Sequence, residues 1–162
     1  MDSDNKYNVV DEMHRTARGF INTAKMLCKD EYSFDYYPLY APVYAVNLSF
    51  ACELSLKEIL LLIDKSYDNS HYLDELFYSL PPNIQKKVQL NYSKKFANKK
   101  IGKCLKKYRN AFVIWRYLYE QVGEIPVPYD DLMEAVNSIR LVAKELYQNY
   151  AKSIGKEIDY AD

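Results

Sequence analysis

The sequence is poor in glycine, proline and histidine, and these shortages exclude several kinds of protein. Its 162 residues include 4 glycines, 6 prolines and 2 histidines. So few turn-forming residues argue against an all-β fold with many tight turns. The glycines are scattered, so the sequence holds no Gly-rich phosphate loop, and it has no Gly-x-Ser-x-Gly nucleophile elbow. Two histidines and distant cysteines give no zinc-binding spacing, and we expect neither a metal nor a cofactor.

Cysteine and long apolar runs are also scarce. The three cysteines, Cys28, Cys52 and Cys104, are odd in number and far apart, which is typical of reduced structural thiols in a cytoplasmic protein. The N-terminal residues MDSDNKYN are acidic and polar, unlike a secretory signal. The longest apolar runs, residues 59–63 and 111–115, are too short to span a membrane. The sequence therefore predicts a cytoplasmic protein without membrane segments.

Helical periodicity is what the sequence has in abundance. Residues 41–65 are apolar almost all round a helix, which predicts a helix at the centre of a bundle. Further helices are expected over about 7–29, 71–80, 82–98, 108–123 and 130–154, while 99–107 is either a loop or a helix start. We therefore predict one all-α domain over residues 1–162, a bundle of about six helices with loose tails at 1–7 and 156–162.

Two local features leave alternatives open. Pro38 and Pro42, in the Tyr-rich run DEYSFDYYPLYAP, argue against a helix through Tyr37. Aromatic side chains in this connector either stack on nucleic-acid bases or, as is more usual, pack a loop onto the bundle. These aromatic residues are Tyr32, Phe34, Tyr36, Tyr37 and Tyr40. His14 lies near the apolar edge of the first helix, and we predict a boundary residue there.

Glu53 and Lys57 are one turn apart in the central helix and share a sector with apolar residues. The spacing predicts an ion pair carried into an apolar neighbourhood. Such a pair is either a buried structural support or a pair tuned for function, and the structural interpretation is favoured.

The net charge of zero conceals a strong asymmetry. No Asp or Glu lies between Glu75 and Glu120, although that stretch of 44 positions holds 11 of the 22 basic residues. From Glu120 onward there are 9 acids against 4 bases. Aromatic residues interleave the lysines, as in RNA and single-strand binders. The basic block either contacts nucleic acid or docks on the acidic C-terminal part of the same or a second subunit.

Three segments, NLSFACELSLKEILLL, SHYLDELFYSLPPNIQKKV and YRNAFVIWRYLYE, together resemble the HEPN family over about residues 44–120. The resemblance implies an all-α helical bundle that is often a homodimer. Many HEPN proteins are metal-independent RNases of toxin–antitoxin and antiviral defence systems, and others are RNA- or nucleotide-binding modules without activity. By this resemblance, an antitoxin or a nucleotidyltransferase is a possible partner.

The resemblance also identifies candidate site residues. Active members carry an arginine, four to six intervening residues and a histidine on one late helix, often with Asn after the arginine. Arg109 and Asn110 match that opening, but the histidine positions hold Ile114, Trp115 and Arg116. Arginine stays protonated at neutral pH and cannot accept the proton of the RNA 2′-hydroxyl. The motif is therefore broken, which favours binding without catalysis.

The predicted function is RNA or nucleotide binding by a catalytically degenerate HEPN-like protein. The candidate phosphate-binding residues are Arg109, Arg116, Lys99, Lys100, Lys103, Lys106 and Lys107. One alternative is an RNase with a nonstandard active site of Arg109, Asn110 and His71, although His71 is expected to cap and pack a helix start. The resemblance also implies an alternative pairing of Glu53, with Arg109 or Arg116 in place of Lys57. The second alternative is a protein-interaction module without a nucleic-acid role.

Overall fold

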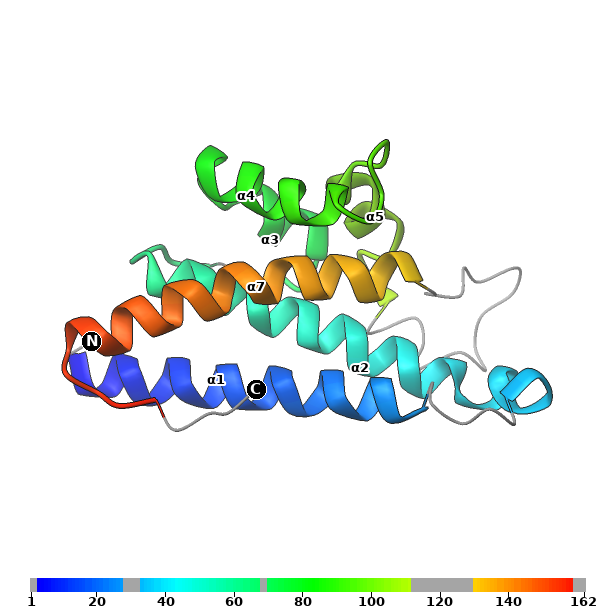
Figure 1. Ribbon diagram of the computed structural model, residues 1–162, viewed down its shortest axis with the longest axis horizontal. Helices are drawn as coiled ribbons and strands as arrows, with labels where there is room; N and C mark the ends of the chain where they lie inside the picture. Colours follow the sequence, from blue (N-terminus) through cyan, green and yellow to red (C-terminus); the bar gives the residue numbers. More distant parts are fainter. Residues whose placement is uncertain (1–2, 28–32, 68–69, 112–129, 159–162) are drawn as a thin grey trace.

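Figure 1 shows the computed structural model, which describes residues 3–27, 33–67, 70–111 and 130–158, with the side chains of Ser3 and of residues 33–40 left undescribed. The helices are α1 (Ser3–Leu27), α2 (Ser33–Leu62), α3 (Leu73–Tyr78), α4 (Pro82–Ser93), α5 (Ile101–Lys107) and α7 (Asp130–Ser153). These ranges contain six helices and no strand, so the predicted all-α bundle is confirmed.

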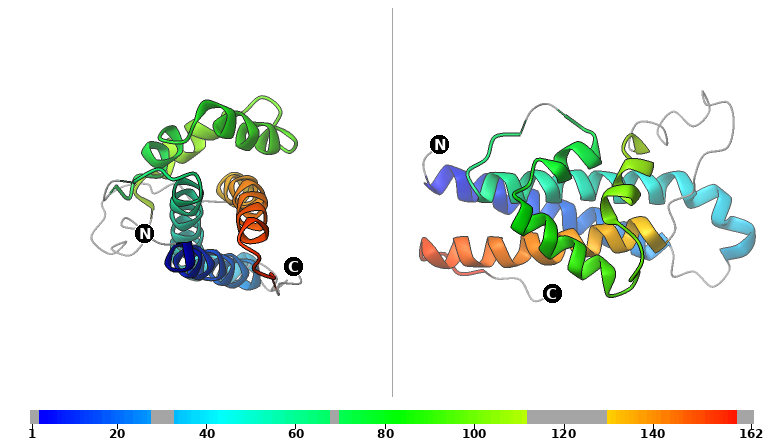
Figure 2. Two further views of the ribbon diagram at one scale, coloured as in Figure 1. Left: turned by 90° about the vertical axis from the view of Figure 1, so that its left-hand side faces the viewer. Right: turned by 90° about the horizontal axis from the view of Figure 1, so that it is seen from above.

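Three long helices, α1, α2 and α7, form the base of the bundle. Viewed end-on, they occupy the corners of a triangle, and α1 runs antiparallel to both α2 and α7 (Figure 2). Both α1 and α7 pack extensively on α2 but meet each other only slightly. The short helices α3, α4 and α5 form a second layer over α2 and α7, on the side away from α1 (Figure 2).

Helix α2 is the central element, as its all-round apolar pattern predicted. Between residues 41 and 62 its only exposed residue is Val43. Polar residues on this helix are satisfied locally, because Ser49 and Ser55 each donate a 2.7 Å hydrogen bond to the carbonyl four residues earlier. The hydrophobic core surrounds α2 and includes Leu48, Leu56, Ile59, Leu60, Val88, Leu105, Leu132 and Ile139.

The start of α2 corrects the sequence prediction. The helix begins at Ser33 and continues through Pro38 and Pro42, where a non-helical connector was expected. Two prolines cost the helix two backbone donors, but Ala41, Tyr44 and Ala45 are buried in the core, and this packing offsets the loss. The ribbon of α2 bends near its beginning, as proline-containing helices do (Figure 2). The predicted base stacking or loop packing of the Tyr-rich run lies outside the described side chains.

Three other predicted boundaries also change. The expected loose segment at residues 1–7 is wrong from Ser3 onward, because Lys6 binds Asp64 at 2.6 Å and lies over the Tyr150 ring. Helix α4 ends at Ser93 instead of residue 98, and α5 begins at Ile101 after a short loop. The helix predicted over 108–123 falls mostly outside the described residues. The last predicted helix is confirmed as α7.

A buried polar network joins the middle of α1 and of α7 to the last part of α2. The His14 Nδ1 atom lies 2.6 Å from Glu58 Oε1, and Arg140 Nη1 lies 2.8 Å from Glu58 Oε2. One residue comes from each of α1, α2 and α7. His14 is therefore not the predicted boundary residue, since only 5% of it is exposed. Burial of the His14 side chain is favourable because a carboxylate and a guanidinium from other helices supply its hydrogen-bond partners.

None of the helices in the described ranges combines the length and the apolar character needed to cross a bilayer.

Candidate functional site

The basic block predicted from the sequence forms a pocket beside α5. Four lysines, Lys99, Lys100, Lys103 and Lys107, line a cavity of about 300 Å³. The remaining lining residues are Tyr92, Asn98, Cys104 and Asp131. We call this site the lysine pocket. The spacing of Lys103 and Lys107 places both on one face of α5, while the preceding loop supplies the other two lysines.

Gln89 of α4 fixes the backbone from which two of these lysines project. Its amide nitrogen donates a 3.0 Å hydrogen bond to the Lys99 carbonyl, and its amide oxygen accepts one of 3.0 Å from the Ile101 backbone nitrogen. The Lys99 ammonium lies 4.2 Å from the centre of the Phe96 ring. The loop between α4 and α5 is thus held in one geometry, so its charges are positioned before any ligand binds.

The floor of the lysine pocket is buried. Tyr92 is fully buried, and its hydroxyl lies beside the Cys104 thiol. Burial raises the pKa of the Cys104 thiol to about 12, and nearby Asp131 adds to the rise. Burial also raises the pKa of the Tyr92 hydroxyl. Both groups therefore remain protonated at neutral pH and add no negative charge to the lysine pocket.

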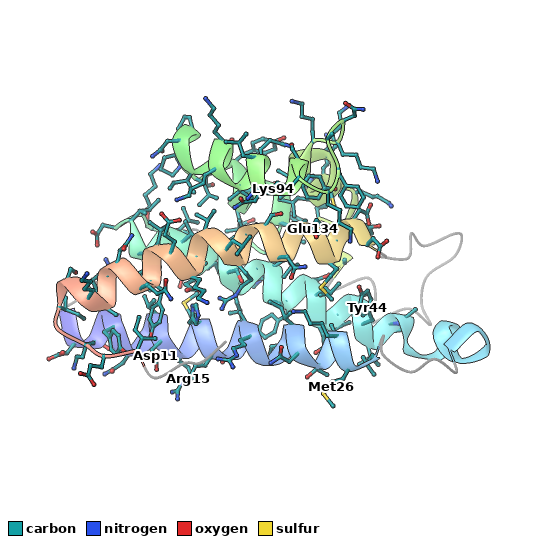
Figure 3. All side chains as sticks on the ribbon, in the orientation of Figure 1. Asp11, Arg15, Met26, Tyr44, Lys94 and Glu134 are labelled. Atoms are coloured by element: carbon teal, nitrogen blue, oxygen red, sulfur yellow. The ribbon has the colours of Figure 1, made fainter. Side chains whose placement is uncertain are left out.

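Part of the basic block instead docks on acidic side chains of α7, in agreement with the second interpretation of its charge. Lys87 pairs with Glu145, Lys95 lies 4.0 Å from Glu134, and Lys107 lies 3.6 Å from Asp131. Figure 3 labels Lys94 and Glu134 on the two sides of this boundary. In the described ranges no acidic side chain pairs with four of the candidate lysines, namely Lys99, Lys100, Lys103 and Lys106. Docking therefore accounts for some of the basic block, and the lysine pocket keeps an excess of positive charge.

Arg109 lies in the turn after α5, not within a helix as the motif alignment requires. Its guanidinium is 3.3 Å from Asp74 and 2.7 Å from Glu75, and it stacks on the Tyr72 ring at 4.3 Å. These contacts attach the turn to the start of α3. A phosphate at Arg109 would have to compete with two carboxylates. The side-chain oxygen of its neighbour Asn110 is buried without a partner among the described residues.

Glu53 has the predicted ion pair and a further partner. Its Oε1 atom accepts from Lys57 Nζ at 2.8 Å and lies 2.8 Å from His71 Nδ1. Glu53 is 3% exposed, whereas the His71 side chain is 63% exposed. The predicted capping role of His71 is wrong, because the N-cap of α3 is Tyr72 and no side-chain bond caps it. His71 reaches back to α2 because a buried carboxylate attracts the nearest donor.

The alternative pairing of Glu53 with Arg109 is not observed, because Arg109 binds the acids of α3. Arg116, the other predicted partner and phosphate ligand, lies outside the described residues, as do Ile114, Trp115 and Cys28. The two described cysteines, Cys52 and Cys104, are buried free thiols, as predicted. Among the described residues no His, Cys, Asp and Glu side chains gather into a group able to hold a metal ion.

Sequence reasoning missed the residues that complete the lysine pocket. Gln89, Asn98 and Asp131 carry no local signal for this site, because a single polar residue on a helix or in a loop has many equivalent roles. Only the packing of α4, α5 and α7 brings these residues to one place.

Comparisons with models of protein families, with curated proteins and with solved structures find no match to this chain. The resemblance to the HEPN family therefore stays a prediction.

Proposed function

We propose that this protein binds RNA through the lysine pocket and does not cleave it, as a catalytically degenerate HEPN-like protein. The observation that carries the proposal is the convergence of four lysines on one pocket whose lining includes a single acidic residue, Asp131. Lysine ammonium groups neutralise phosphates without reading sequence, so the expected ligand is a phosphate backbone of any sequence. A chain of phosphates contacts several lysines at once, so RNA is expected to bind this pocket in preference to a single nucleotide.

Aromatic contacts favour a single strand over a duplex. Phe96 is partly exposed beside Lys99, and its ring centre lies 5.3 Å from that of the buried Tyr92. Unpaired bases stack on a partly exposed ring such as Phe96, whereas the bases of a duplex are already stacked on each other. The proposed ligand is therefore single-stranded RNA whose backbone enters the lysine pocket.

The absence of cleavage rests on the broken motif and on the contacts of Arg109. No histidine follows Arg109 at the family spacing, and Arg109 is held by Asp74 and Glu75. Cleavage of RNA without a metal requires a base for the 2′-hydroxyl and a cation for the phosphate. Here the family base is missing, and the cation is neutralised by neighbouring acids.

Binding of a fluorescent single-stranded RNA, measured by anisotropy at several salt concentrations, tests the proposal. We expect Lys100→Gln/Lys103→Gln to weaken binding and to reduce the slope of log K against log salt by about 1.4, because two phosphate contacts are lost. The matched control is Lys86→Gln/Lys152→Gln, which removes two exposed charges from α4 and α7 outside the pocket. Equal weakening by the control, or no binding by the wild type at low salt, would contradict the proposal.

One observation favours the RNase alternative. His71 is an exposed imidazole whose Nδ1 is held by a buried carboxylate, an arrangement that orients the other ring nitrogen toward solvent. The neighbouring Tyr72 stacks on Arg109, so a base and a cation lie close in the fold. Gel analysis of the same RNA tests this alternative: cleavage by the wild type that is lost in His71→Ala would replace the binding proposal.

The protein-interaction alternative predicts no affinity for RNA at any salt concentration, and the same titration tests it. The wider expectations, a homodimer in the cytoplasm with an antitoxin or nucleotidyltransferase partner in a defence system, stay predictions.

A further inference from the structure

A second basic site lies on the other side of the bundle, between α1 and α7. These two helices both pack on α2 and diverge from each other, which leaves a groove of about 500 Å³. Four cationic and two amide side chains line it, together with Ile21 and Leu141. The polar lining residues are Arg18, Asn22, Lys25, Asn137, Arg140 and Lys144. We call this site the α1–α7 groove. No acidic side chain belongs to the described lining.

Arg140 is built into the floor of the groove by the buried network. Its Nη1 atom donates to Glu58 at 2.8 Å, and its Nη2 atom donates to His14 Nε2 at 3.0 Å. Because arginine only donates, His14 Nε2 accepts, and the His14 proton lies on Nδ1 facing Glu58. The guanidinium is thus fixed in position, with only 13% of the side chain exposed.

Positive charge is concentrated in the groove, and at Arg140 the carboxylate of Glu58 neutralises only part of it. Burial lowers the pKa of Arg140, Glu58 opposes this change, and the nearby charge of Arg18 adds to it. Glu58 is the one carboxylate bound to Arg140 among the described residues, and it lies behind the groove, fully buried. An anion in the groove would face Arg140 from the open side and would replace solvation that the guanidinium has lost.

The chemistry of the walls defines the class of ligand. Cations and amides bind phosphate oxygens, whereas Ile21 and the exposed Leu141 offer an apolar surface next to them. A free phosphate would fill only a small part of 500 Å³. From this geometry we infer that the α1–α7 groove binds a small phosphorylated molecule with an apolar or aromatic body, such as a nucleoside diphosphate. This site is separate from the lysine pocket, which lies against the α4–α5 layer.

Calorimetric titration of the full chain with ADP and with adenosine tests the inference. We expect ADP to bind and adenosine to bind at least about tenfold more weakly, because the cations act on the phosphates. Lys25→Gln/Lys144→Gln should weaken ADP binding about tenfold or more. The control Lys86→Gln/Lys152→Gln removes the same charge elsewhere and should leave ADP binding unchanged. These variants leave Arg140 in place, so the buried network and the fold are retained, which circular dichroism verifies.

The proposal for each of the two sites can be refuted without affecting the other. Lys100→Gln/Lys103→Gln should weaken RNA binding and leave ADP binding intact. Lys25→Gln/Lys144→Gln should weaken ADP binding and leave RNA binding intact. Equal binding of ADP and adenosine would overturn the inference. Unchanged ADP binding in Lys25→Gln/Lys144→Gln would also overturn it. So would an equal loss of ADP binding in the control Lys86→Gln/Lys152→Gln, or a loss of ADP binding in Lys100→Gln/Lys103→Gln alone.

Discussion

Two glutamates five residues apart on α2 have very different surroundings. Glu58 is fully buried and binds His14 of α1 and Arg140 of α7. Glu53 is nearly as buried, but its partners are Lys57, one turn along the same helix, and an exposed histidine. Glu58 therefore links three helices, whereas Glu53 links α2 mainly to itself and to the segment before α3. The comparison teaches that burial alone does not define the role of a charge, because the origin of its partners does.

The largest effect should follow the removal of charge from Glu58. Glu58→Gln leaves the buried Arg140 without its carboxylate, and we expect the free energy of unfolding to fall by about 3–5 kcal/mol. Urea denaturation followed by circular dichroism measures this change. A loss below about 1 kcal/mol would show that Arg140 finds another partner, and the contrast between the two glutamates would then disappear.

Glu53→Gln should cost less, about 1–2 kcal/mol, in the same urea experiment. The His71 side chain is already largely solvated, and the flexible stem of Lys57 can carry its ammonium toward water once the carboxylate is lost. A cost equal to that of Glu58→Gln would refute the ranking. Lys152→Gln, an exposed substitution on α7, serves as the control and should stay within about 0.5 kcal/mol of the wild type.

A smaller effect is expected at the edge of the network around Glu58. Tyr147 of α7 stacks on His14 and donates a 2.7 Å hydrogen bond to Asp11 of α1. Tyr147→Phe removes that bond and keeps the stack, so we expect a loss of about 1 kcal/mol in thermal or urea unfolding. Tyr72→Phe is a matched control on an exposed ring. If Tyr147→Phe were as harmful as Glu58→Gln, the hydroxyl and not the carboxylate would be the main link between α1 and α7.

Cys104 extends the comparison to a buried thiol whose ionised form would lie near the negative charge of Asp131. Burial and Asp131 raise the pKa of its thiol to about 12, so the folded protein holds this proton more tightly than the unfolded chain. Stability from this group is therefore complete below about pH 9 and is lost as the pH rises from there toward 12. Around neutral pH the free energy of unfolding is therefore not expected to vary with pH through Cys104.

Alkylation provides the measurement. At pH 8 we expect Cys104 in the native protein to react with iodoacetamide more than about 100-fold more slowly than in urea, since the thiolate fraction is suppressed. Peptide mass spectrometry resolves it from the other cysteines. Comparable rates in the two states would contradict a buried, protonated thiol.

Much of the fold could be predicted because each helix carries its own signal. The all-round apolar pattern of residues 41–65 identified the central helix, and the pattern of 130–154 located α7 closely. The i, i+4 spacing of Glu53 and Lys57 predicted their ion pair. The start of α2 was missed because a rule about proline is local, while the burial of Ala41 and Tyr44 depends on the whole bundle.

Among the described candidate residues, the lysines were found and their surroundings were not. The acid-free stretch between Glu75 and Glu120 marked the basic block. Which lysines form a pocket and which pair with α7 depends on how α5 sits against the start of that helix. Charge along a sequence gives the quantity of positive charge but not the direction in which each side chain points.

The sequence by itself determined the all-α class, the central helix, the position of the last helix and the segregation of charge. These are properties of single segments, which periodicity and composition express directly. Only the tertiary structure decided that His14, Glu58 and Arg140 meet in the core, and that α1 and α7 diverge to leave a basic groove. The physical reason is that such sites are made by side chains 44 to 126 positions apart, and no local pattern records which distant partner satisfies a buried charge.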